Sequence, residues 1–69
     1  MSEIIKAIRE IMAKYNQNAM KIGEIFKALT KDRMNNVSQI ERDELVAALN
    51  HYSKLQIIHL DADETVIFL

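Results

Sequence analysis

The stretch 37–69 constrains the fold most strongly, because its hydrophobic pattern changes part-way from a helical to a strand-like period. Its first part carries an apolar stripe at positions i, i+3, i+4 and i+7, which predicts an amphipathic helix over about residues 39–54. The stripe consists of Leu45, Ala48, Leu49 and Tyr52. A match to a capping box begins at Ser38, although Glu41 could equally be the cap.

Two short runs of β-branched and aromatic residues follow, at about 56–60 and 65–69, and the polar loop 61–64 connects them. The length and chemistry of this loop predict a β-hairpin. An isolated hairpin is barely stable in water, so it must pack on a surface that the rest of the chain supplies. Ile57 and His59 alternate with Ile58 and Leu60, and Val66 and Phe68 alternate with Ile67 and Leu69. Both faces are therefore apolar, and the face turned away from the helices is covered either by a partner or by flanking side chains.

The first half of the chain predicts two further helices and one strand. A stripe of Ile4, Ile8, Ile11 and Tyr15 predicts a helix over about 3–15. A short strand at 19–22 and a helix at 23–32 follow, and the Asn35-Asn36 pair is a turn signal that ends this second helix. The order helix, strand, helix, helix, strand, strand predicts an α+β fold of the winged-helix type, with a small antiparallel sheet. The 69 residues allow one such domain, spanning 1–69.

The composition offers little for chemistry. With no cysteine and two histidines, the chain lacks thiolate ligands, and a metal site is not expected. A single glycine cannot build a phosphate-cradling loop, and we expect no base close enough to activate Ser2, Ser38 or Ser53. We therefore expect no catalytic residue and no cofactor. We also expect no membrane span or signal peptide, and a reducing intracellular environment.

Charge is distributed unevenly along the chain, although the net charge is only −1. Residues 1–33 carry a balance of +3, and residues 34–69 carry a balance of −4. In a winged helix that binds DNA, the third helix enters the major groove and the hairpin contacts phosphate. Here the third helix begins with Glu41-Arg42-Asp43-Glu44 and the hairpin loop carries three carboxylates. These charges oppose phosphate binding, so groove reading by this helix is not expected.

The run 43–69 resembles the C-terminal end of subunits of the minichromosome maintenance (MCM) replicative helicase, closest to the subunit-seven type. The resemblance rests on the acidic start Asp43-Glu44-Leu45, on Tyr52 three residues before Leu55, on the pair Ile57-Ile58, and on the ending Val66-Ile67-Phe68-Leu69. The upstream segments IIKAIREI and IGEIFKAL are similar to the first two helices of the same terminal domain. The resemblance implies a non-catalytic winged-helix module for docking and regulation, whose parent subunit is an ATP-dependent DNA helicase. It also implies a nuclear location if the source is eukaryotic, and partners among other helicase subunits or loading factors.

Two sets of residues are candidates for binding. The expected protein-contact surface is the outer face of the third helix together with the acidic loop: Asp43, Glu44, Asn50, His51, Lys54, Asp61, Asp63 and Glu64. A second hypothesis is a small DNA-binding regulator that uses the basic half of the chain: Lys6, Arg9, Lys14, Lys21, Lys27 and Lys31. These cations could also be no more than a solvated outer surface. A third hypothesis is a free-standing adaptor domain, and in every case we expect the domain alone to be monomeric.

Overall fold

The first helix, α1 (Ser2–Lys14), ends in a Schellman motif. In this computed structural model, which describes residues 2–31 and 36–69, Asn16 adopts the left-handed backbone conformation with φ 55°. The Gln17 N–H donates to the Met12 carbonyl at 2.8 Å. The Asn16 N–H donates to the Ala13 carbonyl at 3.1 Å, which completes the motif. Asparagine tolerates this backbone conformation better than most residues, which explains why the helix ends here.

Tyr15 does not belong to the buried stripe of α1, so that part of the prediction is wrong. Ile8 and Ile11 are buried and Ile4 is partly buried, but the Tyr15 side chain is 49% exposed. The helix ends at Lys14, so Tyr15 is its C-cap residue, where the chain already turns away from the helical path. A periodicity that holds along a helix does not extend past its end.

Strand β1 (Ala19–Lys21) leads directly into helix α2 (Ile22–Lys31), which begins one residue earlier than predicted. The Lys21 N–H, at the N-cap position, donates to Oε1 of Glu24 at 3.1 Å. This bond gives a partner to one of the backbone donors that a helix start leaves without one. The predicted helix end at residue 32 and the turn signal at Asn35 lie outside the described residues.

Helix α3 (Arg42–Lys54) begins three residues later than predicted. The chain makes a turn in which the Ile40 N–H donates to the Val37 carbonyl at 3.1 Å, and Ile40 then enters the core. Glu41 is the N-cap and forms a capping box with Glu44, so the alternative cap is the one observed and the box at Ser38 is not formed. Because Ile40 is buried directly before the N-cap, the helix can begin only after it. The local sequence pattern does not reveal this burial.

Strand β2 (Ile58–Leu60) starts two residues later than the predicted residue 56, because of the way in which α3 ends. Gln56 has φ 62°, and its N–H donates to the Ser53 carbonyl at 3.0 Å. The Ile57 N–H donates to the Tyr52 carbonyl at 3.1 Å, so a second Schellman motif closes this helix. The N–H groups of Gln56 and Ile57 are bonded to carbonyls of the helix, so the strand starts only at Ile58.

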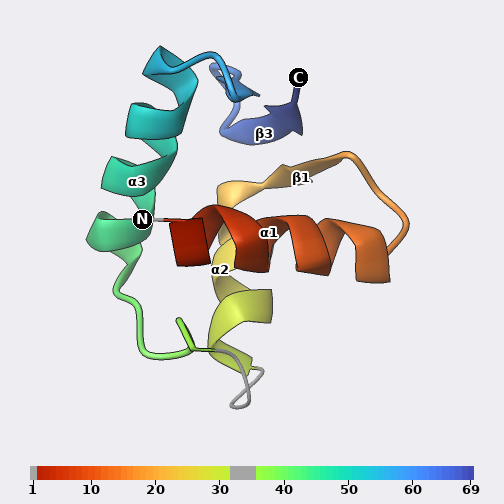
Figure 1. The fold of residues 1–69 in the computed structure, drawn as a ribbon, viewed down its shortest axis with the longest axis vertical. Coiled ribbons are helices and arrows are strands. Elements are labelled where there is room, and N and C mark those ends of the chain that lie inside the picture. The colour runs from red at the N-terminus through yellow and green to blue at the C-terminus, as the bar shows by residue number, and fades with distance from the viewer. Residues whose placement is uncertain (1, 32–35) are drawn as a thin grey trace.

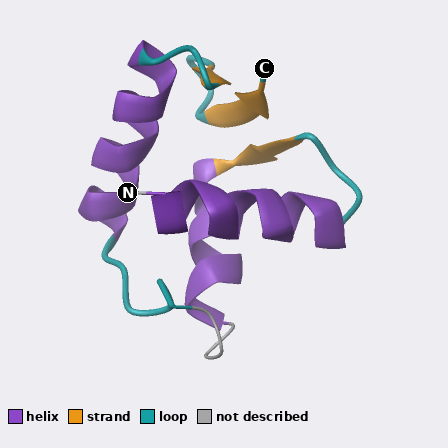
Figure 2. Ribbon diagram, viewed as in Figure 1, coloured by secondary structure: helices purple, strands orange, loops and turns teal. Residues whose placement is uncertain are grey.

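The sheet has three antiparallel strands in the order β1-β3-β2, with β3 (Thr65–Phe68) in the centre (Figure 2). Met20 on β1 and Leu60 on β2 are both Cα partners of Val66, on opposite sides of β3. The predicted α+β class, with three helices and a small antiparallel sheet in the predicted order, is therefore confirmed for the described residues.

The core lies where the three helices meet the inner face of the sheet. In Figure 1, α1 crosses in front of α2, and α3 lies at the left. The strands lie above α1, past the N-terminal end of α2. Val66 and Ile58 on the inner face are fully buried, together with Leu45, Leu49 and Tyr52 of α3. The remaining buried apolar residues are Ala7, Ile8, Ile11, Met12, Met20, Ile22, Ile25, Leu29 and Ile40.

Candidate protein-interaction surface

The hairpin loop is a tight turn held by its own backbone and side chains. The Asp61 N–H donates to the Thr65 carbonyl at 2.9 Å, and the Glu64 N–H donates to the Asp61 carbonyl at 3.0 Å. Glu64 has φ 69°, a left-handed conformation that normally favours glycine or asparagine. This is the pattern of a three-residue hairpin loop that ends in a left-handed residue.

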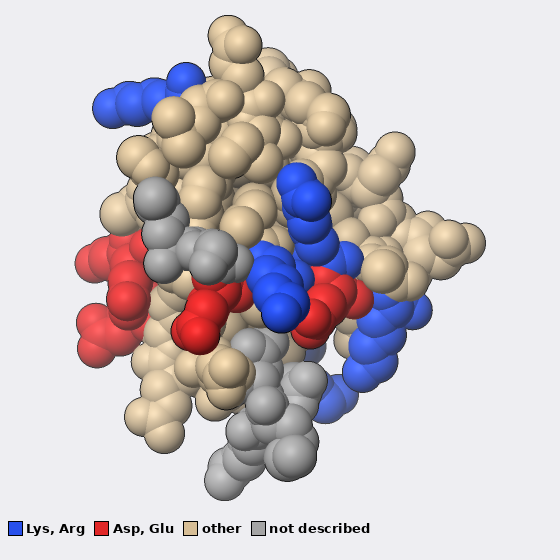
Figure 3. Space-filling model, in the orientation of Figure 1, with Lys and Arg blue, Asp and Glu red and all other residues tan. Residues whose placement is uncertain are grey.

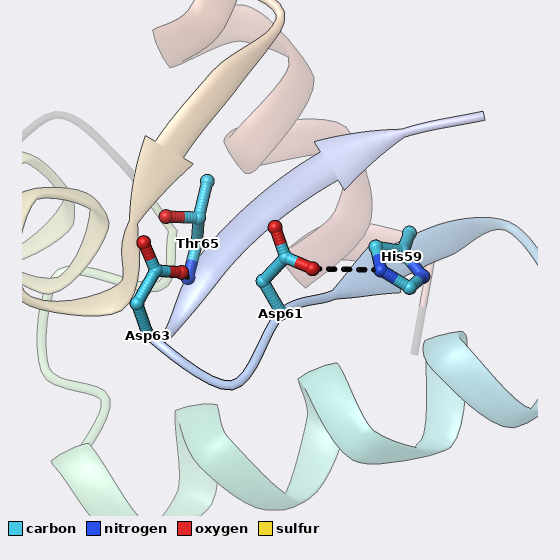
Figure 4. A network of polar contacts seen from close by, with 4 residues as sticks. All are labelled: His59, Asp61, Asp63 and Thr65. Atoms are coloured by element: carbon cyan, nitrogen blue, oxygen red, sulfur yellow. Dashed lines mark hydrogen bonds and ion pairs between the residues drawn. The ribbon is translucent and has the colours of Figure 1, made fainter.

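Side chains in and beside this loop also have structural roles (Figure 4). Asp63 Oδ1 accepts the Thr65 N–H at 3.2 Å, and Asp61 Oδ1 lies 2.9 Å from His59 Nε2. Hydrogen bonds from Thr65, chiefly from its hydroxyl, lower the pKa of the Asp63 carboxyl, and the charge of Lys21 acts in the same direction. At neutral pH the loop therefore presents Asp63 as a carboxylate.

Tertiary contacts place the loop beside the beginnings of two helices. The Ile22 N–H at the start of α2 donates to the Glu64 carbonyl at 3.0 Å. At the start of α3, Nη2 of Arg42 lies 3.9 Å from Oε1 of Glu64. Both side chains of this ion pair are largely exposed, so it positions the two elements only weakly. The loop and the first turn of α3 nevertheless meet at one side of the molecule.

These two neighbouring elements carry six exposed carboxylates, and we call this the acidic surface: Glu41, Asp43, Glu44, Asp61, Asp63 and Glu64. Two cations lie beside these carboxylates: Arg42, 3.9 Å from Glu64, and Lys21, whose charge acts on Asp63. In Figure 3 a group of acidic side chains lies at the left edge, over the beginning of α3. Glu41 and Glu44 also cap α3, whereas the side chain of Asp43 makes no hydrogen bond or ion pair within residues 2–31 and 36–69.

The structure brings together only part of the predicted protein-contact set. Asp43 and Glu44 lie next to the loop, but Asn50, His51 and Lys54 lie farther along α3, and all three are exposed. Asn50 is eight residues beyond Arg42, about 12 Å along the helix axis. The candidate surface therefore separates into an acidic part at the helix start and a mixed part toward its end.

Arg42 was not among the predicted contact residues, although it joins the two acidic elements. The signal available in the sequence was a single cation inside the run 41–44, which is otherwise acidic. Its pairing with Glu64 depends on tertiary structure, because 22 positions separate the two residues.

The six predicted DNA-contact residues are all exposed and lie on α1, β1 and α2: Lys6, Arg9, Lys14, Lys21, Lys27 and Lys31. They do not act as one uniform patch. The Arg9 guanidinium lies over the Phe68 ring at 5.2 Å, and the Lys14 ammonium lies over the Tyr15 ring at 5.9 Å. Lys21 contributes its charge near Asp63, on the acidic side of the molecule.

The outer face of the sheet is only partly covered. Ile57 and Ile67 are half-buried, His59 is exposed, and Leu69 is 76% exposed. The opposite face, with Ile58 and Val66, is the buried one. Flanking side chains therefore shield part of the second apolar face, and part of it remains open to solvent.

Among the described residues, no group of three or more His, Asp and Glu side chains is placed to hold a metal ion. In the same residues, no buried side chain is polar or charged. No helix of the described part of the chain is long and apolar enough to cross a membrane. Comparisons of the chain with protein-family models, with curated proteins and with solved structures found no match.

Proposed function

We propose that this chain is a non-catalytic winged-helix module of an MCM-type replicative helicase subunit, which acts by docking on other proteins. Two observations support the assignment. The element order and the strand order β1-β3-β2 are compatible with a winged helix. The stretch 43–69 resembles the end of MCM subunits of the subunit-seven type. The partners are other subunits of the helicase ring or its loading factors, and the location is nuclear if the source is eukaryotic.

The single observation that carries the docking function is the acidic surface. Its position, at the start of α3 and at the hairpin loop, is where a winged helix would approach DNA. Six exposed carboxylates lie on these two elements, beside two exposed cations, Arg42 and Lys21. Phosphate contacts supply most of the non-specific affinity for DNA, so this surface repels the duplex. A protein that presents lysines or arginines fits it instead.

A salt-dependent titration onto a short DNA duplex tests this function. Proteins that bind DNA non-specifically have Kd values of about 10⁻⁴–10⁻⁶ M at physiological salt. We expect weaker binding for this chain, and chemical-shift changes at Asp43 and Glu64 when neighbouring helicase subunits or loading factors are added. Tight DNA binding whose affinity falls steeply between about 50 and 200 mM salt would contradict the docking function.

A pair of matched variants makes the test specific to the surface. Asp43→Lys with Glu64→Lys changes the acidic surface, and Glu3→Lys with Glu10→Lys makes the same charge change on α1. Only the first pair should abolish binding to the protein partner, because only this pair alters the docking surface. Equal losses for the two pairs would show that net charge, and not this surface, drives association.

The second candidate function is a small DNA-binding regulator that uses the basic half of the chain. Exposure of all six cations on α1, β1 and α2 favours it. In that case the titration would give a Kd in the micromolar range, and Lys27→Ala would reduce the salt slope by about one.

A further inference from the structure

A second surface, on the side of α2 near the end of α1, has both an apolar floor and a definite charge. Tyr15 and Gln17 face α2 across a shallow groove of about 300 Å³. Met20, which is 7% exposed, and the half-buried Ala28 contribute apolar lining. The Schellman motif at the end of α1 leaves the Tyr15 ring half in solvent at one wall of this groove.

The rim of the groove is predominantly cationic. Lys27 and Lys31 lie one turn apart on the same side of α2, and both line the groove. The Lys14 ammonium lies over the Tyr15 ring at 5.9 Å, beside the groove. Glu24 is the one carboxylate in the groove lining within the described residues, and its Oε1 accepts the Lys21 N–H at 3.1 Å.

We propose that this groove docks an acidic segment of another protein, which inserts one apolar or aromatic side chain against Tyr15 and Met20. Charge complementarity supports this occupant, since carboxylates on either side of the inserted residue would meet Lys14, Lys27 and Lys31. A half-exposed tyrosine beside a buried methionine provides a rigid apolar contact at low entropic cost. The proposal is independent of the acidic surface, which lies at the start of α3 and the hairpin loop.

Single-stranded nucleic acid is the competing occupant, because an exposed aromatic ring among cations can stack with a base. Two features of the described residues favour a protein. Within residues 2–31 and 36–69 the groove lining contains no arginine that could stack on a base, and Glu24 in the lining opposes a continuous phosphate backbone. With a volume of about 300 Å³, the groove has room for one apolar or aromatic side chain.

Titration of the isotope-labelled 69-residue chain with three probes tests the proposal. The probes are a short synthetic peptide with one phenylalanine flanked by aspartates and glutamates, the same peptide with alanine in place of phenylalanine, and oligothymidylate. We expect the first peptide to shift the backbone NMR signals of Gln17, Met20 and Ala28. The alanine peptide should bind about tenfold more weakly, because it cannot fill the apolar floor.

Variants of the chain separate the groove from general charge effects. Lys27→Glu with Lys31→Glu should weaken the first peptide about fivefold to tenfold. The control, Lys6→Glu with Lys54→Glu, makes the same charge change outside the groove and should leave the shifts in place. Tyr15→Ala should weaken binding and Tyr15→Phe should preserve it. Equal binding by the phenylalanine and alanine peptides, equal effects of the two charge variants, or tighter binding of oligothymidylate would overturn the proposal.

Discussion

Replacing Val66 by threonine should destabilise the domain far more than the same replacement at the next residue, Ile67. Val66 is fully buried at the centre of β3, between Met20 and Leu60. Threonine has nearly the same shape as valine, but its hydroxyl would enter an apolar core. Burial of a hydroxyl without a good partner costs about 1–3 kcal/mol in proteins. Ile67 points to the other face, where a hydroxyl can reach water.

The magnitude can be set against the stability that a domain of this size can have. A core in a chain below about 70–80 residues rarely supplies more than about 3–5 kcal/mol. A loss of about 2 kcal/mol at Val66 would therefore remove roughly half of the free energy of unfolding. For Ile67→Thr the loss is mainly partly buried methyl and methylene surface, and should be about 1 kcal/mol or less.

Urea unfolding followed by far-UV circular dichroism provides the assay. With a slope of about 1 kcal/mol per molar urea, the midpoint should fall by about 2 M for Val66→Thr and by less than about 1 M for Ile67→Thr. Both variants should keep the slope of the parent chain. An equal or larger loss for Ile67→Thr would refute the reasoning, because it would mean that the outer face of the sheet is the packed one.

Two further predictions concern the acidic surface. Because its pKa is lowered in the folded state by the hydrogen bonds from Thr65, ionised Asp63 contributes stability above its ordinary pKa, and this contribution is lost as pH falls through the lowered value. Asp63→Asn should therefore flatten the acid limb of a plot of unfolding free energy against pH, and an unchanged limb would rule this out. Glu44→Ala removes the capping-box acceptor that lies 3.5 Å from the Glu41 nitrogen, and should cost about 0.5–2 kcal/mol in thermal or urea unfolding, toward the lower end because the bond is long. Glu44→Gln keeps an acceptor and should cost less; an equal loss would argue against the cap.

Local pattern was sufficient for the elements and for most of the core. The stripe in α3 predicted the burial of Leu45, Leu49 and Tyr52, and the alternation after residue 56 predicted the hairpin. The carboxylates of the acidic loop and of the first turn of α3 are also plain in the sequence. Each of these depends on neighbours within one or two turns of chain, and so a periodicity or a short motif is enough to reveal it.

Several element ends differ from the predicted ones, because they depend on core packing and on helix-end hydrogen bonds that the apolar periodicity does not contain. Burial of Ile40 moved the start of α3 to Arg42, and a left-handed Gln56 delayed β2 to Ile58. The left-handed Asn16 ended α1 before Tyr15 could join the core. At the ends of α1 and α3 the last helical carbonyls accept hydrogen bonds from residues just beyond the helix, so these residues cannot join the next element.

The sequence by itself determined which charges this protein carries, in which order its helices and strands follow one another, and that the hairpin needs a surface to pack on. Only the tertiary structure decided that Glu64 and Arg42 meet, and that Tyr15 and Lys27 line one groove. The physical reason is chain separation: residues that are distant along the chain become neighbours only when the core closes. Surfaces made from several elements are therefore products of packing, and local pattern cannot specify them.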